Sequence, residues 1–450
     1  MGTTLHSVRV AVWGEAPDTP EERKLLRKID FFILTYCCVA FFFNYLDRAV
    51  LGNAYVSGMK EDINLTGNEY NILVTVLSVG YIIGQVPHGL IIQKVRPRIW
   101  FPLMTLVWAL LTMACAACNS FGHLVPWHAV HHRSWYKGPE VGKRVGLFQA
   151  SGMVGTMFAG ILMTAIYNTM NGVAGLAGWR WSFIIDGIIT IPVAVFGYYF
   201  FPDLPETTQN PEGHNIGPSL IKRVLFAPNF WIFTIFWTLG GALEAFSTQT
   251  CMVLWMKASK LFTVPQNNTY PLGITAIGIF LTLLTSILID ATGVHGPYGL
   301  IACGVQLVTC VIILCWDLVG TEAKMAGFYL AGTAYLIQPV VFTWANKILA
   351  RDGDDAARAV ILYAMNGSSS VLFSFWGIAL YPATDAGTGF RKGAIAMVVV
   401  SVLLAGWIGV VWWQDRRTQV PEITQGELQT KIEEGAEMEL TTTKDGHVKN

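Results

Sequence analysis

Charged side chains inside apolar runs are the first candidates for chemistry in this sequence. Asp47 and Arg48 lie near the end of the apolar run at 29–50, beside aromatic residues. Ionisable groups are costly inside a bilayer and usually have a function there. An adjacent acid and base can form a proton switch, because protonation of Asp47 frees Arg48 to hold a substrate carboxylate bidentately. The alternative is that both side chains only reach the outer interface and anchor the helix.

Three further polar residues lie within or at the end of apolar runs. Glu244 is central in its run and has no cation within one helical turn, so it could carry a proton or be a hydrogen-bonded structural acid. Asn346 and Asn366 could line a substrate cavity, although helix-packing hydrogen bonds are the simpler role for either one. Asp186 is interpreted as structural.

Several other classes of site are not expected. No phosphate-binding glycine loop and no constellation of nucleophile, base and orienting group is found, so neither a cofactor nor an enzyme is indicated. The net charge is zero, which gives no reason to expect a nucleic-acid partner. The eight cysteines lie in apolar runs and do not suggest a disulfide framework or a zinc site. Four histidines without an accompanying acid or cysteine do not predict a metal site; they are His123, His128, His131 and His132.

The composition indicates how these residues are positioned. Of 450 residues, 53% are hydrophobic and 13% charged, whereas a soluble domain carries about 25% charged residues. An all-α membrane protein is therefore predicted, with the lipid bilayer as its surroundings. A span needs roughly 20 mostly apolar residues. Eleven stretches meet that need: 29–50, 70–92, 99–119, 145–168, 181–201, 230–256, 272–290, 297–316, 325–346, 359–382 and 393–413.

The distribution of basic residues conflicts with eleven spans. The basic tail at 1–28 is predicted to be cytoplasmic, and this places the segment 120–144 outside, although it carries four basic residues against one acid. One additional span near 119–133 would remove the conflict, but four histidines and a proline there cannot form a lipid-exposed span. The sequons at Asn64 and Asn267 lie outside in the twelve-span arrangement and are candidates for glycosylation.

Short motifs in a specific order carry a resemblance to a known family. They include Asn44-Tyr-Leu-Asp47-Arg48, Gly178-Trp-Arg-Trp181 and Phe342-Thr-Trp-Ala-Asn346. The chain resembles the fungal anion:cation symporters (the allantoate permease family) of the major facilitator superfamily, and within them most nearly the pantothenate transporters. The resemblance implies two pseudo-symmetric helical bundles at 29–202 and 229–414. A cytoplasmic linker at 203–228 would join them, and a disordered cytoplasmic tail would follow at 415–450.

The resemblance also implies a function. It suggests a monomeric secondary active transporter in the plasma membrane, with proton-coupled uptake of a small organic carboxylate such as pantothenate. The fourth of the usual twelve spans is missing between Leu124 and Ser134, where the family places an arginine and an acid that work with Asp47 and Arg48. Two alternatives therefore stay open: export of a fungal secondary metabolite by the same fold, and a transport-impaired product that lacks one helix.

Overall fold

The computed structural model describes residues 34–91, 96–121, 141–200, 218–248, 251–352 and 354–418. Within these ranges every regular element is a helix, as the composition predicts. Three predicted segments lie wholly or mostly outside the described residues. They are the tail at 1–28, the His-rich junction between Leu124 and Ser134, and the linker at 203–228.

The helices that precede the short helix α10 (Pro218–Leu225) are called here the N-terminal helices. They are α3 (Thr35–Ala54), α4 (Lys60–Asp62), α5 (Glu69–Ile91), α6 (Pro97–Cys115), α8 (Val141–Met170) and α9 (Gly178–Phe200). α3 passes into α4 through a π turn, η2 (Tyr55–Met59). Gly58 in this turn has φ +116°, which side-chain-bearing residues rarely adopt, so the change of direction after α3 requires glycine.

The helices that follow α10 are called the C-terminal helices. They are α11 (Pro228–Thr248), α12 (Cys251–Ser259), α13 (Val264–Thr269), α14 (Leu272–Thr292), α15 (Gly296–Leu314), α16 (Thr321–Ala331), α17 (Ile337–Ala350), α18 (Asp355–Leu380) and α19 (Arg391–Thr418), with 3-10 turns η5 (Gly332–Leu336) and η6 (Ala383–Thr388). Side chains define some of their ends. Thr263 and Gln266 form a capping box at the start of α13, and the Asp354 carboxylate accepts a hydrogen bond from the Ala357 N–H at the start of α18.

One predicted boundary needs correction. The predicted linker contains a helix, α10, and the predicted disordered tail begins four residues too early, because α19 continues to Thr418. Asp415 explains the longer helix. Its carboxylate accepts a hydrogen bond from Trp344 Nε1 at 2.8 Å and forms an ion pair with Arg351 at 2.8 Å, which ties the last turns of α19 to α17.

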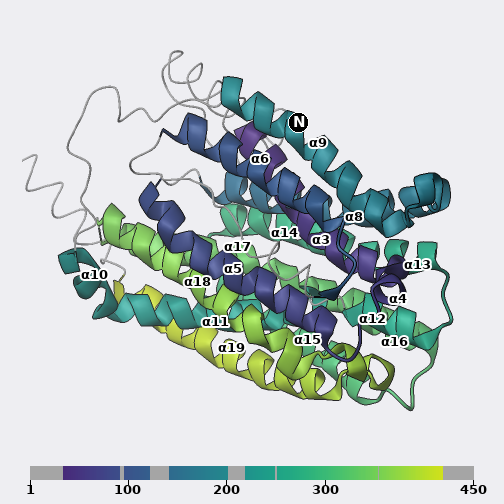
Figure 1. Cartoon of the computed structure of the whole chain (residues 1–450). Helices are drawn as coiled ribbons and strands as arrows, with labels where there is room; N and C mark the ends of the chain where they lie inside the picture. The colour runs from purple at the N-terminus through teal and green to yellow at the C-terminus, as the bar shows by residue number, and fades with distance from the viewer. Residues whose placement is uncertain are drawn as a thin grey trace, which may run out of the picture.

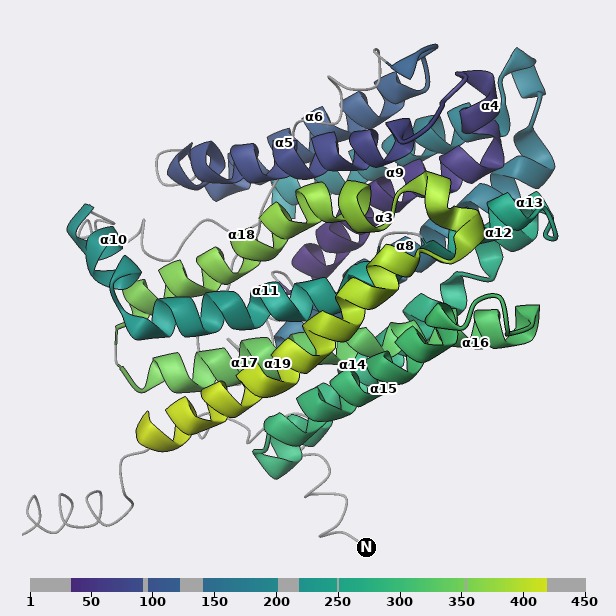
Figure 2. The ribbon, with the colours of Figure 1, turned by 90° about the horizontal axis from the view of Figure 1, so that it is seen from below.

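The helices lie roughly side by side, so the bundle has two ends. α10 lies at one end and α4, α12, α13 and α16 lie at the other (Figure 1). These are called the α10 end and the α4 end. From below, α5, α6 and α9 form one side of the molecule and α11, α15, α17 and α19 the other, while α3, α8 and α18 lie between them (Figure 2).

Membrane-spanning capacity can be judged by length and composition. Among the described residues, eight helical stretches are long and apolar enough to cross a membrane, so the predicted count of eleven is not confirmed by this criterion. α3 and α18 are not among the eight, and α5 contributes only the shorter apolar stretch Glu69–Gly80. α3 carries Asp47 and Arg48 and α18 begins with an acid and a base, which lowers their hydropathy.

α6 and α8 run in the same direction. α9 starts at the α4 end, because Arg180 in its first turn contacts Asp62 of α4 as well as Ala116 and Asn119, which follow α6. α8 ends at that same end, where Asn171 accepts a hydrogen bond from the Gly178 N–H at 2.9 Å. Hence α6 ends at the α4 end and α8 begins at the α10 end. The helices after the junction have the orientation of the twelve-span arrangement, not the inverted one that an eleven-span chain would give.

The two groups of helices join at the α4 end. A buried apolar cluster there contains residues of both groups, including Leu46 and Tyr55 on one side and Phe246 and Tyr381 on the other. A second cluster, around Trp344, consists of residues of α10 and the C-terminal helices. Polar contacts cross the first boundary too. Lys257 Nζ donates to the Tyr55 carbonyl oxygen at 2.9 Å, and Asn268 Nδ2 donates to Ser57 Oγ at 2.9 Å; both contacts tie α12 and α13 to η2.

Asn71 makes the most extensive of these contacts. It is 4% exposed, near the start of α5. Its Nδ2 donates to the carbonyl oxygens of Gly377 and Tyr381 at 3.2 and 3.1 Å, and its Oδ1 accepts from the Ala383 N–H at 2.9 Å. One buried side chain thus satisfies three backbone groups at the C-terminal end of α18, which holds the two groups of helices together.

Candidate functional site

A cavity of about 660 Å³ lies between the N-terminal and C-terminal helices. This volume is in the range of small-molecule sites. The residues that line it come from both groups and are mainly aromatic or polar. They include Tyr36, Phe41, Tyr45, Asp47, Arg48, Thr105, Trp108, Gln149, Thr156, Trp237, Glu244, Tyr335, Gln338, Asn366, Ser369 and Ser370.

Arg48 provides positive charge in this cavity. Among the described residues that line the cavity, it is the only lysine or arginine. Its guanidinium lies 5.7 Å from the ring centroid of Tyr45, a cation–π geometry that restricts the position of a long side chain. Tyr45 is itself placed by Phe41, whose ring centroid is 4.6 Å away and which stacks on Phe148 of α8 at 3.9 Å. The positive charge of Arg48 is therefore positioned by aromatic rings in the cavity wall.

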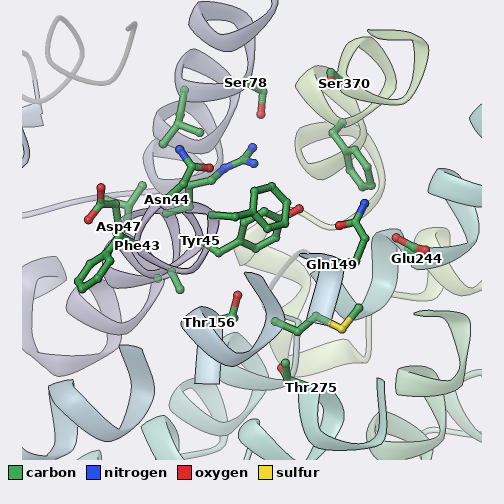
Figure 3. A pocket seen from close by; sticks show the side chains of 18 of the residues that line it. Phe43, Asn44, Tyr45, Asp47, Ser78, Gln149, Thr156, Glu244, Thr275 and Ser370 are labelled. Carbon is green, nitrogen blue, oxygen red and sulfur yellow. The ribbon is translucent and has the colours of Figure 1, made fainter. Parts of the chain in front are cut away.

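Asp47 does not point in the same direction as Arg48. Adjacent residues in an α-helix are separated by about 100° around the axis. Asp47 lies on the side of α3 opposite Tyr45, Gln149 and Glu244 (Figure 3). It is 6% exposed and directed toward α6 and α9, where Trp108 and Asp186 lie. The predicted switch within the adjacent pair therefore needs revision: Arg48 faces the cavity, whereas Asp47 contacts other helices at its edge.

Glu244 brings an acid to the cavity from the C-terminal helices. It lies in α11 and is 3% exposed. Gln338 Nε2 of α17 donates to Glu244 Oε2 at 3.0 Å. Gln149 of α8 lies on the same side of the cavity (Figure 3), so amides from both groups of helices lie around this carboxyl. The hydrogen bond from Gln338 agrees with a hydrogen-bonded acid, and both roles considered for Glu244 stay open.

A polar row on α18 forms another part of the wall. Ser369 Oγ accepts from Trp237 Nε1 at 2.9 Å, and Ser368 Oγ is 2.9 Å from Thr238 Oγ1, so α11 and α18 are held together by hydroxyl contacts. Asn366 lies one turn before them and lines the cavity. Ser369 therefore contributes both to helix packing and to the cavity wall, and Asn366 contributes to the cavity wall.

The structure brings together four of the five predicted site residues. Asp47, Arg48, Glu244 and Asn366 line one cavity, whereas Asn346 does not. Asn346 lies near the α10 end of α17, beside the segment in which Lys347 Nζ donates to the Gly293 carbonyl oxygen. The sequence did not identify Tyr45, Gln149 and Gln338, because aromatic and amide residues in apolar runs give no distinctive pattern.

The two glycosylation candidates differ in exposure. Asn64 is exposed at the α4 end. Asn267 is 4% exposed within α13, so this conformation leaves no room for a glycan there. Groups of His, Cys, Asp and Glu that could hold a metal ion do not occur among the described residues.

Comparison with known proteins gives consistent matches over most of the chain. A family model described as Major Facilitator Superfamily matches residues 37–375. Pantothenate transporter liz1 of Schizosaccharomyces pombe is 40% identical over 413 residues, covering 84% of this chain and 80% of that protein. Pantothenate transporter FEN2 of Saccharomyces cerevisiae is 35% identical over 433 residues, covering 87% and 83%. The match with liz1 spans 413 aligned positions, which is more than the 84% of this 450-residue chain that takes part in it. Some of these positions therefore hold a residue in liz1 and a gap in this chain.

A solved structure matches the fold. The bacterial homolog to the human lysosomal transporter Spinster, in an inward-facing and occupied conformation, gives a TM-score of 0.64 and covers 87% of this chain and 99% of its own. Sequence identity is 15%, so this likeness concerns the fold alone.

Proposed function

The chain belongs to the major facilitator superfamily, and on this basis we propose that it is a secondary active transporter for proton-coupled uptake of a small organic carboxylate. Pantothenate or a related anion is the proposed substrate, since two relatives that match most of the chain are named pantothenate transporters. The proteins it matches are transporters and not enzymes. The proposed setting is the plasma membrane, and the proposed unit is the monomer.

One observation gives the main support for a carboxylate as the substrate. Arg48 brings positive charge to a cavity of about 660 Å³ whose wall is otherwise aromatic and polar. A guanidinium binds a carboxylate with two parallel hydrogen bonds, and the surrounding rings and hydroxyls suit a small hydroxylated or amide-containing body. The cavity lies between the two groups of helices, where major facilitator proteins change access from one side to the other.

The orientation proposed for the chain places the α10 end in the cytoplasm. Lys222, Arg223, Arg416 and Arg417 lie at that end, which agrees with the excess of basic residues in cytoplasmic segments. The α4 end then faces outward, and the contacts of Asn71, Lys257 and Asn268 close it. The described conformation is accordingly proposed to be open toward the cytoplasm.

Uptake of radiolabelled pantothenate in a yeast strain without its own permease tests the proposal. Cells that express the chain should accumulate label, and a proton uncoupler should abolish the accumulation. Efflux of preloaded label without uptake would favour the exporter alternative. Correctly inserted protein with no movement of label in either direction would favour a transport-impaired product, in keeping with the missing fourth span.

Asn71 gives a prediction for the conformational cycle. Asn71→Ala removes three hydrogen bonds, worth about 2–4 kcal/mol together, and should shift the population toward a state that is open at the α4 end. Spin labels on Thr66→Cys and Leu261→Cys, both exposed at that end, should then show an added longer distance.

Asn119→Ala is the matched control for that measurement. Asn119 also lies at the α4 end, but its Oδ1 accepts from Arg180 Nη2 at 2.9 Å within the N-terminal helices. Its replacement should leave the distance distribution unchanged. Equal distributions for the two variants would show that Asn71 does not hold this end closed.

A further inference from the structure

Asp47 and Asp186 face each other inside the N-terminal helices. Asp47 lies in α3 and is 6% exposed; Asp186 lies in α9 and is fully buried. Their carboxyl groups are within hydrogen-bonding reach of one another. Sequence alone does not link two residues so far apart along the chain, and it favours a structural role for Asp186.

The surroundings of the pair contain little to stabilise two negative charges. None of the four carboxyl oxygens has a hydrogen-bond donor in good geometry among the described residues. α6 presents the indole N–H of Trp108, an uncharged donor, within hydrogen-bonding reach of Asp47. Arg48, the neighbouring cation on α3, stands over the ring of Tyr45 instead. The described elements around the pair therefore present no cation in direct contact with either carboxyl.

Simple electrostatics then determine the protonation of the pair. Two carboxylates in contact repel each other strongly where the effective dielectric constant is low, and sharing one proton turns that repulsion into a hydrogen bond. The pair adjoins the cavity, because Asp47, Trp108 and Thr190 line it while Asp186 lies behind them. The pair is thus buried and separated from the cavity only by the side chains of its wall.

We propose that Asp47 and Asp186 together form the proton-binding site of the transporter, in the wall of the cavity and apart from the substrate. The inference rests on the proposed proton coupling. Protonation would draw α3 and α9 together through the shared proton, and loss of the proton would separate them by charge repulsion. Because Arg48 follows Asp47 directly in α3, a rotation or shift of this turn moves the guanidinium, which connects the proton to the carboxylate that Arg48 holds.

The test uses the purified full chain in proteoliposomes with labelled pantothenate. Two assays are compared: accumulation driven by an inward proton gradient, and counterflow, which exchanges substrate without net proton movement. Asp186→Asn should reduce gradient-driven accumulation at least tenfold and leave counterflow within twofold of wild type. Asp47→Asn should give the same split. Asp317→Asn, an isosteric change of an exposed acid, should preserve both assays.

The results separate this inference from the proposed function. Wild type without gradient-driven accumulation would reject the proton coupling itself. Normal wild-type accumulation with an Asp186→Asn variant that still accumulates would overturn the carboxyl pair and leave the proposed function intact. Loss of both assays in the variant could reflect misfolding, so wild type is also treated with a carbodiimide, which reacts with protonated buried carboxyls. Peptide mapping should find the label on Asp47 or Asp186 at neutral pH; two unlabelled carboxyls would overturn the pair.

Discussion

Replacing Arg48 with lysine should raise the pantothenate concentration for half-maximal uptake by about ten- to a hundredfold. A charge-assisted hydrogen bond contributes about 1.5–3 kcal/mol, and 1.4 kcal/mol corresponds to a factor of ten in affinity. Lysine keeps the positive charge but loses the planar fork that binds both carboxylate oxygens and that lies over the Tyr45 ring. The measurement is the concentration dependence of initial uptake rates, normalised to the amount of protein in the membrane.

A ligand comparison makes this prediction specific to the carboxylate. The analogue of pantothenate with a primary alcohol in place of the carboxylate should compete poorly against wild type, and the Arg48→Lys change should hardly alter its inhibition. Arg391→Lys, an exposed arginine at the start of α19, is the matched control and should behave as wild type. If the lysine variant lost affinity equally for the acid and the alcohol, Arg48 would support the cavity wall and not bind the carboxylate.

Much of the fold follows from hydropathy alone, because a helix that crosses a bilayer must be long, apolar and internally hydrogen-bonded. The predicted run at 272–290 corresponds closely to α14, and the run at 297–316 to α15. The turns that interrupt these helices are harder to predict from the sequence. The predicted run at 325–346 is divided by the 3-10 turn η5, and the π turn η2 follows α3 without a break in apolar character. Such turns depend on packing against neighbouring helices and leave only a weak mark on the sequence.

The site was predictable as a set of residue types and not as a geometry. Ionisable residues inside apolar runs are rare enough to stand out, which identified Asp47, Arg48 and Glu244. Their partners are far away along the chain: Asp47 meets Asp186, and Glu244 meets Gln338. Contacts of this kind depend on the angular position of each residue on its helix and on which helices adjoin. Neither property can be read from hydropathy.

The fourth span that the resemblance leaves unmatched does not change the direction of the later helices. α8 has the orientation that a twelve-span protein would give it, so the cavity retains contributions from both groups of helices. The family resemblance implies an arginine and an acid on the fourth span, and the sequence between Leu124 and Ser134 contains no acid. If transport is proton-coupled, the acid must come from elsewhere, and Asp186 is the buried acid that already contacts Asp47.

Replacing Gly155 with alanine should strongly reduce the stability of the folded protein. α3 and α8 cross so closely that a Cβ on Gly155 would collide with the carbonyl oxygen of Phe42, and one on Gly152 would lie 2.7 Å from the Phe41 ring. The Phe41 ring can rotate away from a new methyl group, but the Phe42 backbone cannot move unless the whole of α3 shifts. Small residues at such crossings permit the close approach that stabilises membrane helices. Gly155→Ala should therefore cost at least about 3 kcal/mol, at the upper end for overpacked sites.

Gly304→Ala is the control that makes the Gly155 result interpretable. Gly304 also lies within a long helix, α15, but a Cβ there has no atom within 4 Å. The same added methyl group should be neutral or slightly stabilising at this position, because alanine favours a helix over glycine by about 1 kcal/mol. Fluorescence-detected size exclusion after heating should show a lowered melting temperature or no monodisperse peak for Gly155→Ala only. Phe41 and Tyr45 lie on the same face of α3. A tolerated Gly155→Ala would therefore mean that the rings around Arg48 can move, and that they do not restrict the position of its side chain.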